Sequence, residues 1–181
     1  MKPVKLIEIK SELGAGTRGA SLGVDALKIA ALDFRSDYFK KYPSVEVAND
    51  NTQLFEPQGS PFAKRIKSIY SLFEKLSDQV YKTLRKNEFP IILAGDHSSA
   101  AATIAGIKMA YSKSHIGVVW IDAHADLHTP YTTPSGNLHG MPLAAALGED
   151  NLDCKVHDLD EKTISLWKQL KTIGKINPKI L

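Results

Sequence analysis

Histidine and aspartate residues gather in two short polar segments of the chain, and each segment directly follows an apolar run. Residues 95–97 (GDH) follow the run 91–94, and residues 122–126 (DAHAD) follow the run 116–121. Short apolar runs of this kind predict buried strands. The carboxyl ends of parallel strands meet at one edge of a sheet, where α/β proteins bind their ligands. We therefore expect the two polar segments to lie close together at such an edge.

The second segment carries three potential metal ligands at alternate positions. In an extended backbone Asp122, His124 and Asp126 would point the same way. Polar side chains aimed at one point are costly unless a positive group sits there. Imidazole and carboxylate together suit divalent manganese, iron, cobalt or zinc, and bridging carboxylates could hold two ions that generate hydroxide. A single histidine or aspartate is usually a surface or capping residue, but two segments with the same ligand types favour a metal site.

The elements that must position these residues begin with a strand. The alternating, branched residues 4–9 predict this strand, and residues 24–32 predict a helix after it. Residues 41–61 are rich in turn formers and predict a long surface loop. Ser60 and Pro61 then form a typical helix start. The amphipathic helix that we expect there buries one stripe at spacings of three and four, made of Ile66, Ile69, Phe73, Leu76, Val80 and Leu84.

The second half of the chain continues the alternation of strands and helices. Buried strands are expected at 90–94 and 116–121, and helices from Ser98 or Ser99 to about Ala110, at 142–147 and at 162–170. Such alternation predicts a mostly parallel sheet with helices on both faces, a three-layer α/β/α fold, in one domain spanning 1–181. The closing Ile180-Leu181 looks like the start of a further strand.

A glycine-rich loop offers a competing interpretation. Gly14, Gly16 and Gly19 fit the dinucleotide-binding pattern G-x-G-x-x-G, with Asp37 at a suitable distance. The strand leading into the loop is polar at its end, however, and the next helix is expected only after the third glycine. A pyrophosphate would then miss the helix N-terminus that should hold it. We favour a tight loop beside the active-site edge.

Composition excludes several other functions. The 181 residues carry a net charge of +3, which is too balanced to suggest nucleic acid as the main partner. Cys154 is the only cysteine, so neither an internal disulfide nor a thiolate metal cage is expected. No apolar stretch approaches membrane-spanning length, and the charged N-terminus does not resemble a signal peptide. These features predict a cytoplasmic protein without a membrane or nucleic-acid partner.

Three strings of the sequence resemble the ureohydrolase family, which includes arginase, agmatinase and formiminoglutamase. They are GDHS at 95–98, WIDAHAD at 120–126 and SGNLHG at 135–140. The first two are shared across the family, whereas the third is most similar to arginases. The loop ELGAGTRG at 12–19 also looks like the arginase N-terminal loop. The resemblance covers nearly the entire chain.

The resemblance implies a centre with two manganese ions. His97 would be a ligand of one ion and His124 of the other, and Asp122 and Asp126 would be further ligands that bridge the ions. Hydroxide held between the ions would attack the guanidinium carbon of L-arginine and give ornithine and urea. Asp126 thus also counts among the catalytic residues.

The resemblance also implies roles around the substrate. His139 would pass a proton to the leaving amine, and Ser135 and Asn137 would hold the α-carboxylate of the amino acid. His128 stands where arginases usually place an asparagine that contacts this carboxylate. The change could be tolerated or could retune the site for another guanidino acid. His115 and His157 match no motif, and we interpret both as structural or surface residues.

The family carries further acidic ligands downstream, and this chain stops before any of them. The centre is therefore expected to be under-liganded, in an arginase-like domain that is incomplete at its C-terminus. Alternatives are another ureohydrolase, namely an agmatinase, a formiminoglutamase or a guanidino-acid hydrolase, or a shortened, non-catalytic paralogue that binds metal or a partner. Relatives of this family are commonly trimers or hexamers, so a homo-oligomer is possible.

Overall fold

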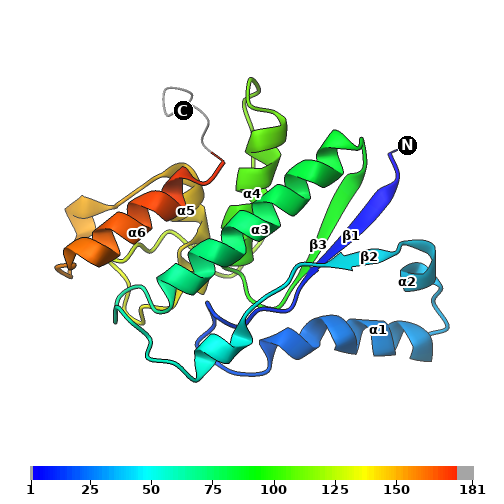
Figure 1. Cartoon of the computed structure of the whole chain (residues 1–181), viewed down its shortest axis with the longest axis horizontal. Coiled ribbons are helices and arrows are strands. Elements are labelled where there is room, and N and C mark those ends of the chain that lie inside the picture. Colours follow the sequence, from blue (N-terminus) through cyan, green and yellow to red (C-terminus); the bar gives the residue numbers. More distant parts are fainter. Residues whose placement is uncertain (1, 175–181) are drawn as a thin grey trace.

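The computed structural model describes residues 2–174. The main elements follow one another as β1 (Val4–Ile9), α1 (Gly23–Asp33), α2 (Tyr38–Lys41), β2 (Ser44–Glu46), α3 (Ile66–Arg85), β3 (Phe89–Ala94), α4 (Ser99–Ala110), α5 (Pro142–Leu147) and α6 (Glu161–Thr172). Figure 1 shows the strands at one end of the molecule and α5 and α6 at the other. Short 3-10 turns lie in the connecting loops, among them η1 (Ala20–Leu22) and η3 (Leu138–Gly140).

The sheet has the order β2-β1-β3, and both of its strand pairs are parallel. Leu6 of β1 is level with Ser44 on one side and with Ile91 on the other. Parallel strands need crossover connections, and helices supply them here: α1 and α2 lie between β1 and β2, and α3 lies between β2 and β3. This confirms the predicted α/β class.

Successive residues of β1 face opposite sides of the sheet, and both sides are covered. Ile7 and Ile9 belong to the main apolar core. The side chain of Glu8 points the other way, where Lys28 of α1 donates a 2.6 Å hydrogen bond to it. Helices α1 and α3 accordingly lie on opposite sides of the strands (Figure 1).

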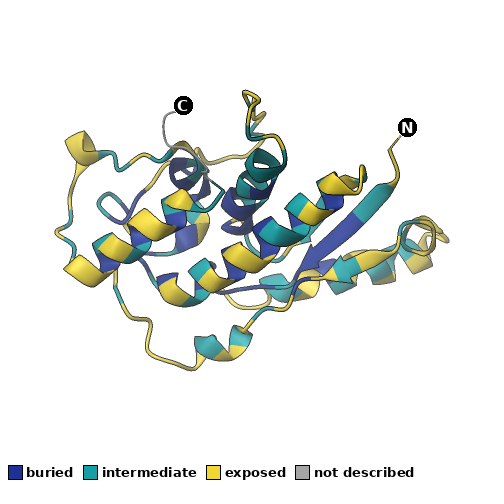
Figure 2. Cartoon of the chain, turned by 45° about the horizontal axis from the view of Figure 1, so that its top comes forward, coloured by how far each residue is buried: buried dark blue, intermediate teal, exposed yellow. Residues whose placement is uncertain are grey.

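The long helix α3 organises the core. Its predicted stripe is largely buried, with Ile69, Leu76 and Val80 fully inaccessible, and its outer side is exposed (Figure 2). Helices α4 and α6 pack against it, and Trp167 of α6 joins the same core. The predicted helix start was wrong, however. Ser60 has no regular structure, Pro61 lies in a turn, and α3 begins only at Ile66, after Arg65 adopts a left-handed backbone with φ of 57°.

The other predicted elements of the described chain are placed as follows. Helix α4 ends at Ala110, α5 has the predicted bounds, and α1 and α6 are each one or two residues longer at their ends than expected. The surface loop expected at 41–61 is interrupted by β2 and by the 3-10 turn η2 (Asn51–Leu54). Strand β2 was missed because three residues are too short to show a periodic pattern. The strand expected at Ile180-Leu181 lies outside the described residues.

The predicted strand at 116–121 is wrong. This segment has no regular secondary structure, and Val119 and Ile121 are 88% and 93% exposed. Branched apolar residues favour a strand, but a strand forms only where backbone N–H and C=O groups find a neighbour. Within residues 2–174 the sheet ends at β3, and this segment pairs with none of its strands. In the same range, no helix has the length and apolarity needed to cross a membrane.

Candidate functional site

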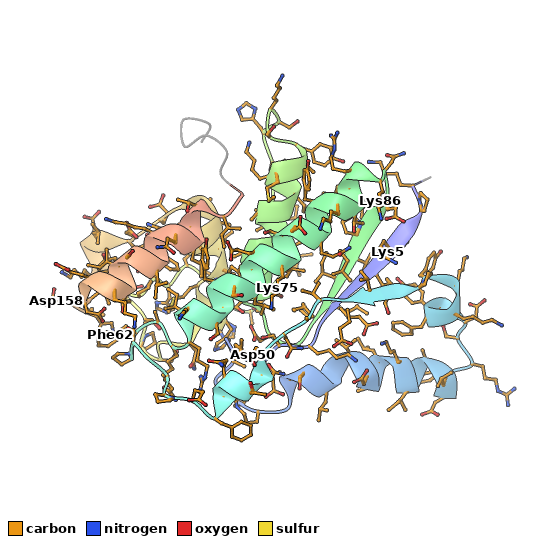
Figure 3. The ribbon with its side chains drawn as sticks, viewed as in Figure 1. Lys5, Asp50, Phe62, Lys75, Lys86 and Asp158 are labelled. Atoms are coloured by element: carbon orange, nitrogen blue, oxygen red, sulfur yellow. The ribbon has the colours of Figure 1, made fainter. Side chains whose placement is uncertain are left out.

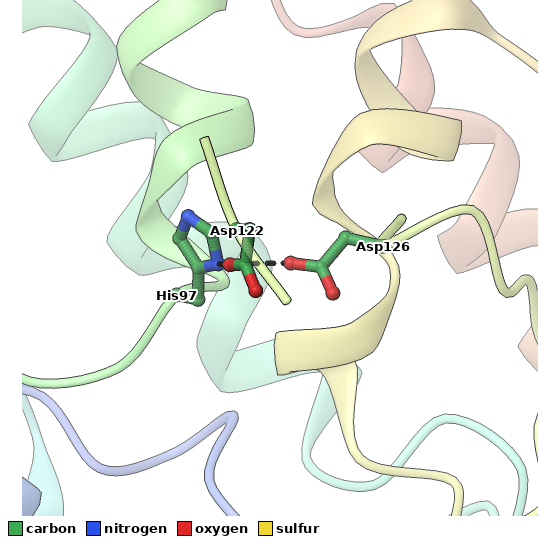
Figure 4. Close-up of side chains that lie close together, drawn as sticks. All are labelled: His97, Asp122 and Asp126. Carbon is green, nitrogen blue, oxygen red and sulfur yellow. Dashed lines mark ion pairs between the residues drawn. The ribbon is translucent and has the colours of Figure 1, made fainter. Parts of the chain in front are cut away.

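Three of the predicted metal ligands converge just beyond the carboxyl end of β3. The Nδ1 atom of His97 lies 2.8 Å from Oδ2 of Asp122 and 2.9 Å from Oδ2 of Asp126 (Figure 4). One ligand atom from each side chain lies within 4.8 Å of the other two. The ring of His97 also stacks on Trp120, with centroids 4.8 Å apart. The cluster therefore brings together side chains from the end of β3 and from the segment that follows residue 119.

The charges of this cluster favour a bound cation. His97 Nδ1 carries at most one proton, so it cannot donate a full hydrogen bond to both carboxylates. Asp126 is buried, and its Oδ2 receives no hydrogen bond of good geometry from the described residues. Burial raises the pKa of Asp126, and the nearby charge of Asp122 raises it further against the opposing effect of His97. A divalent ion would supply the positive charge that these carboxylates lack.

The surroundings of Asp122 lower its pKa, whereas those of Asp126 raise the pKa of that residue. The backbone N–H of His124 donates a 2.8 Å hydrogen bond to its Oδ1, and this bond is the main reason why the pKa of Asp122 is lowered. The second polar segment is bent rather than extended, and Asp126 has a left-handed backbone with φ of 51°. His124 therefore does not point where the extended pattern predicts. Its side chain is 83% exposed, and it lies outside the cluster of three.

All of the predicted site residues nevertheless line one pocket. Its volume is about 790 Å³, and its wall includes His97, Asp122, His124, Asp126, His128, Ser135, Asn137 and His139. The Nδ1 atom of His128 lies 3.3 Å from the hydroxyl of Thr132. The pocket is large enough for a small amino acid with an extended side chain.

The loop that carries Ser135 is fixed from two sides. The buried Thr133 hydroxyl accepts hydrogen bonds from the N–H groups of Ser135 and Gly136. Gly136 has a φ of +73°, and a Cβ there would lie 1.8 Å from the carbonyl oxygen of Pro61. On the other side, His157 Nε2 lies 2.6 Å from the carbonyl oxygen of Thr133. The ring of His157 stacks on Phe62, with centroids 3.9 Å apart. Figure 3 shows Phe62 in the loop that precedes α3. His157 is therefore a structural residue that supports this loop.

The glycine-rich loop forms a further part of the surroundings. The N–H of His139 donates a 3.1 Å hydrogen bond to the carbonyl oxygen of Gly14. A Cβ at Gly16 would lie 2.8 Å from Nδ2 of Asn137. The 3-10 turn η1 follows Gly19 directly and leads into α1 at Gly23. The N–H groups of Gly19 and Ser21 at this start donate to the carboxylate of Glu12, so they do not hold a pyrophosphate as nucleotide binding would need.

Asp96 lies inside the GDHS string, although no role was predicted for it. Asp96 Oδ2 accepts a 3.1 Å hydrogen bond from the N–H of Gly14, and its Oδ1 accepts bonds from the N–H and hydroxyl of Ser98. Burial raises its pKa, while the bonds from Ser98 and Gly14 oppose this rise. Its position directly before His97 in the sequence was the signal that could have indicated a role for Asp96.

A parallel sheet covered on both faces, with a His–Asp cluster beyond the carboxyl end of an edge strand, defines an α/β protein with a candidate divalent-metal site. A sequence model of the arginase family matches residues 2–164. The chain therefore belongs to the arginase family.

Sequence relatives agree with this assignment. The chain is 36% identical to an arginase of Bacillus caldovelox over 152 residues, which cover 82% of this chain and 50% of the relative. It is 37% identical to an arginase of Bacillus subtilis over 148 residues, covering 81% and 49%. The chain thus spans about half the length of these curated relatives.

Solved structures give the same result for the fold. The native structure of the Bacillus caldovelox arginase has a TM-score of 0.73 and 33% identity, covering 99% of this chain and 55% of the other. The Entamoeba histolytica arginase, whose structure contains L-ornithine, has a TM-score of 0.71 and 30% identity, covering 90% and 57%.

Proposed function

We propose that this chain carries part of the catalytic centre of a manganese-dependent ureohydrolase that converts L-arginine into ornithine and urea. The observation that carries the proposal is the convergence of His97, Asp122 and Asp126 on one point of a pocket that the predicted substrate residues also line. The arginase names of the sequence relatives and the L-ornithine in the Entamoeba histolytica structure support the choice of substrate.

The residues of the centre fit a divalent ion. One imidazole nitrogen and several carboxylate oxygens are a donor set for manganese, iron, cobalt or zinc, and a buried oxygen of Asp126 accepts no hydrogen bond from the described residues. His97, Asp122 and Asp126 would hold the ion, and His124, which lines the same pocket, would be a ligand of a second one. A bound divalent ion supplies Lewis acidity and a nucleophile derived from water at neutral pH.

The pocket residues would orient the amino acid. Ser135 and Asn137 offer neutral hydrogen-bond donors for an α-carboxylate, and His128 offers an imidazole beside them. His139 lines the same pocket and is exposed, so its ring can exchange protons with solvent and pass one to the departing amine. Neutral donors select a carboxylate without adding positive charge near the metal.

A second candidate is a non-catalytic protein that binds metal. The observation in its favour is that only three ligand side chains converge within residues 2–174, while His124 remains largely exposed. Three ligands can hold one ion but leave most of its coordination shell to water.

A single assay separates these candidates. The purified 181-residue protein is supplied with excess manganese and either L-arginine or agmatine, and urea is measured. We expect urea from arginine in preference to agmatine, because agmatine lacks the α-carboxylate that Ser135 and Asn137 would bind. Preference for agmatine would reassign the substrate. Saturable manganese binding without urea from any guanidino compound would favour the second candidate.

The Asn137→Ala variant sharpens the substrate assignment. Loss of one hydrogen bond to a charged group costs about 1.5–3 kcal/mol, so KM for arginine should rise roughly tenfold or more. Any residual turnover of agmatine should stay unchanged, since agmatine has no carboxylate at this position. An equal loss for both substrates would show that Asn137 does not bind the α-carboxylate.

A further inference from the structure

The carboxylate of Glu12 lies at the root of the glycine-rich loop and binds several of its groups. Glu12 is 6% exposed. Its Oε1 accepts hydrogen bonds from the N–H of Gly19 at 2.9 Å and from the N–H and hydroxyl of Ser21 at 3.1 Å and 2.5 Å. Arg18 Nη1 lies 3.5 Å from its Oε2. One side chain thus closes the loop from its first residue to the residues that follow its last glycine.

The loop is also attached to the end of β3. Gly14 donates its N–H to Asp96, and a Cβ at Gly14 would lie 2.7 Å from Oγ of Ser98. Any larger residue at this position would force the side chains of Ser98 and Asp96 to shift. Glu12 fixes the shape of the loop, and Asp96 fixes its place beside His97.

The far side of the loop touches two residues of the substrate pocket. The carbonyl oxygen of Gly14 accepts the N–H of His139, and Gly16 lies directly against the side-chain amide of Asn137. A change in the shape of the loop would therefore move the groups that contact substrate, even though Glu12 itself does not line the pocket.

We propose that Glu12 is a positioning residue, which holds the glycine-rich loop in the shape that sets Asn137 and His139 in the substrate pocket. The roles of Asn137 and His139 rest on the proposed function, but the mechanical link from Glu12 to these residues does not. Among the described residues, all groups that donate hydrogen bonds to the carboxylate of Glu12 belong to this loop or to the turn after it. Its effect on the pocket must therefore pass through the loop.

The test uses Glu12→Gln in the whole chain, with Glu56→Gln as the matched control. Both variants lose one negative charge, but Glu56 is exposed and its side chain takes part in none of the hydrogen bonds or ion pairs of the described residues. In Glu12→Gln we expect the Gly19 and Ser21 amides to exchange with deuterium roughly tenfold faster, because charge-assisted hydrogen bonds are lost. We also expect NMR signals of the Asn137 side-chain amide and the His139 ring to shift. Neither change is expected in Glu56→Gln.

Two further variants keep the proposal falsifiable if Glu12→Gln fails to fold. Ser21→Ala removes one donor to Glu12 and should shift the Asn137 and His139 signals in the same direction by a smaller amount. Gly16→Ala presses on Asn137 from the loop side and should shift its amide signal while the Glu12 contacts remain. Signals of Asn137 and His139 that coincide with those of the wild type in these variants would overturn the proposal, even if the loop amides exchange faster.

A kinetic arm separates positioning from stability. In Glu12→Gln, KM for L-arginine should rise several-fold because Asn137 is displaced, and kcat should fall several-fold because His139 is displaced, while manganese affinity stays unchanged since the metal ligands are not disturbed. Unchanged values of both KM and kcat would count against the proposal. If the wild-type protein forms no urea at all, the proposed function fails, and the NMR arms still decide the role of Glu12.

Discussion

Glu12 and Asp126 are buried almost equally, at 6% and 7% exposure, yet their surroundings are opposite. Glu12 accepts hydrogen bonds from two backbone N–H groups and a hydroxyl, and Arg18 lies beside it. These contacts, led by the hydroxyl of Ser21, lower the pKa of Glu12. Asp126 lies next to Asp122, one of its buried oxygens accepts no hydrogen bond from residues 2–174, and burial raises its pKa.

The contrast separates two uses of a buried carboxylate. A carboxylate whose charge is fully compensated stabilises the fold around it, whereas a buried carboxylate that lacks compensation reduces stability. A buried carboxylate of the second kind is a candidate for binding a positively charged ligand. The contrast thus assigns Glu12 to the architecture of the loop and supports the proposal that Asp126 binds a ligand.

The largest effect is expected from Asp126→Asn. Removal of the buried carboxylate from the cluster should lower the affinity for manganese by about 100-fold, or about 2.7 kcal/mol. The metal-free variant should melt at the same temperature as the wild type or a few degrees higher, because a neutral amide is less costly to bury. Calorimetric titration with manganese and thermal unfolding without metal measure the two effects.

Asp33→Asn is the matched control for this change. Asp33 is an exposed residue at the end of α1, so its loss should alter neither manganese affinity nor melting temperature. Manganese affinity that is unchanged in Asp126→Asn would remove Asp126 from the metal centre.

An intermediate effect is expected from Glu12→Gln, which should lower stability, whereas Asp126→Asn should leave the stability of the metal-free protein unchanged or raise it. The free energy of unfolding at pH 7 should fall by about 1–3 kcal/mol in Glu12→Gln, since the variant weakens several hydrogen bonds to a charged group. The pKa of Glu12 is lowered from an ordinary value of 4.5. Its stabilising effect should therefore be complete above about pH 4.5 and disappear as the pH falls through the lowered pKa.

Urea unfolding of the wild type and Glu12→Gln across the acid range measures this dependence. The difference in unfolding free energy between the two proteins should stay constant from pH 7 to about pH 4.5 and then narrow. A difference that grows on acidification would mean that Glu12 is not a compensated carboxylate.

Local patterns predicted most of the fold correctly. The bounds of β1 and α5 and the buried stripe of α3 all follow from periodicity and from residue types within a short window. The start of α3 did not, because the turn at residues 61–65 is set by contact with Gly136, which lies some seventy residues further along the chain. A local helix-start signal cannot include such a contact.

The candidate site was predictable in composition but not in geometry. The ligand types correctly indicated that His97, Asp122 and Asp126 meet, although only His97 follows a strand of the described sheet. The predicted direction of His124 required an extended backbone, and an extended backbone would require the segment before it to pair in a sheet. That segment pairs with no strand in residues 2–174, so the backbone bends at Asp122 and His124 turns to solvent.

The smallest of these effects is accordingly expected from His124→Asn. Because the His124 ring is 83% exposed and lies outside the three-ligand cluster, its loss should lower the affinity for the manganese ion that His97, Asp122 and Asp126 would hold by no more than several-fold, far less than Asp126→Asn. His115→Asn, which changes another exposed histidine that lies outside the pocket, is the control. Equal losses in His124→Asn and Asp126→Asn would show that metal draws the ring into the cluster. The bend at Asp122 would then be a property of the metal-free chain, and the alternation of ligands in the sequence would describe the metal-bound one.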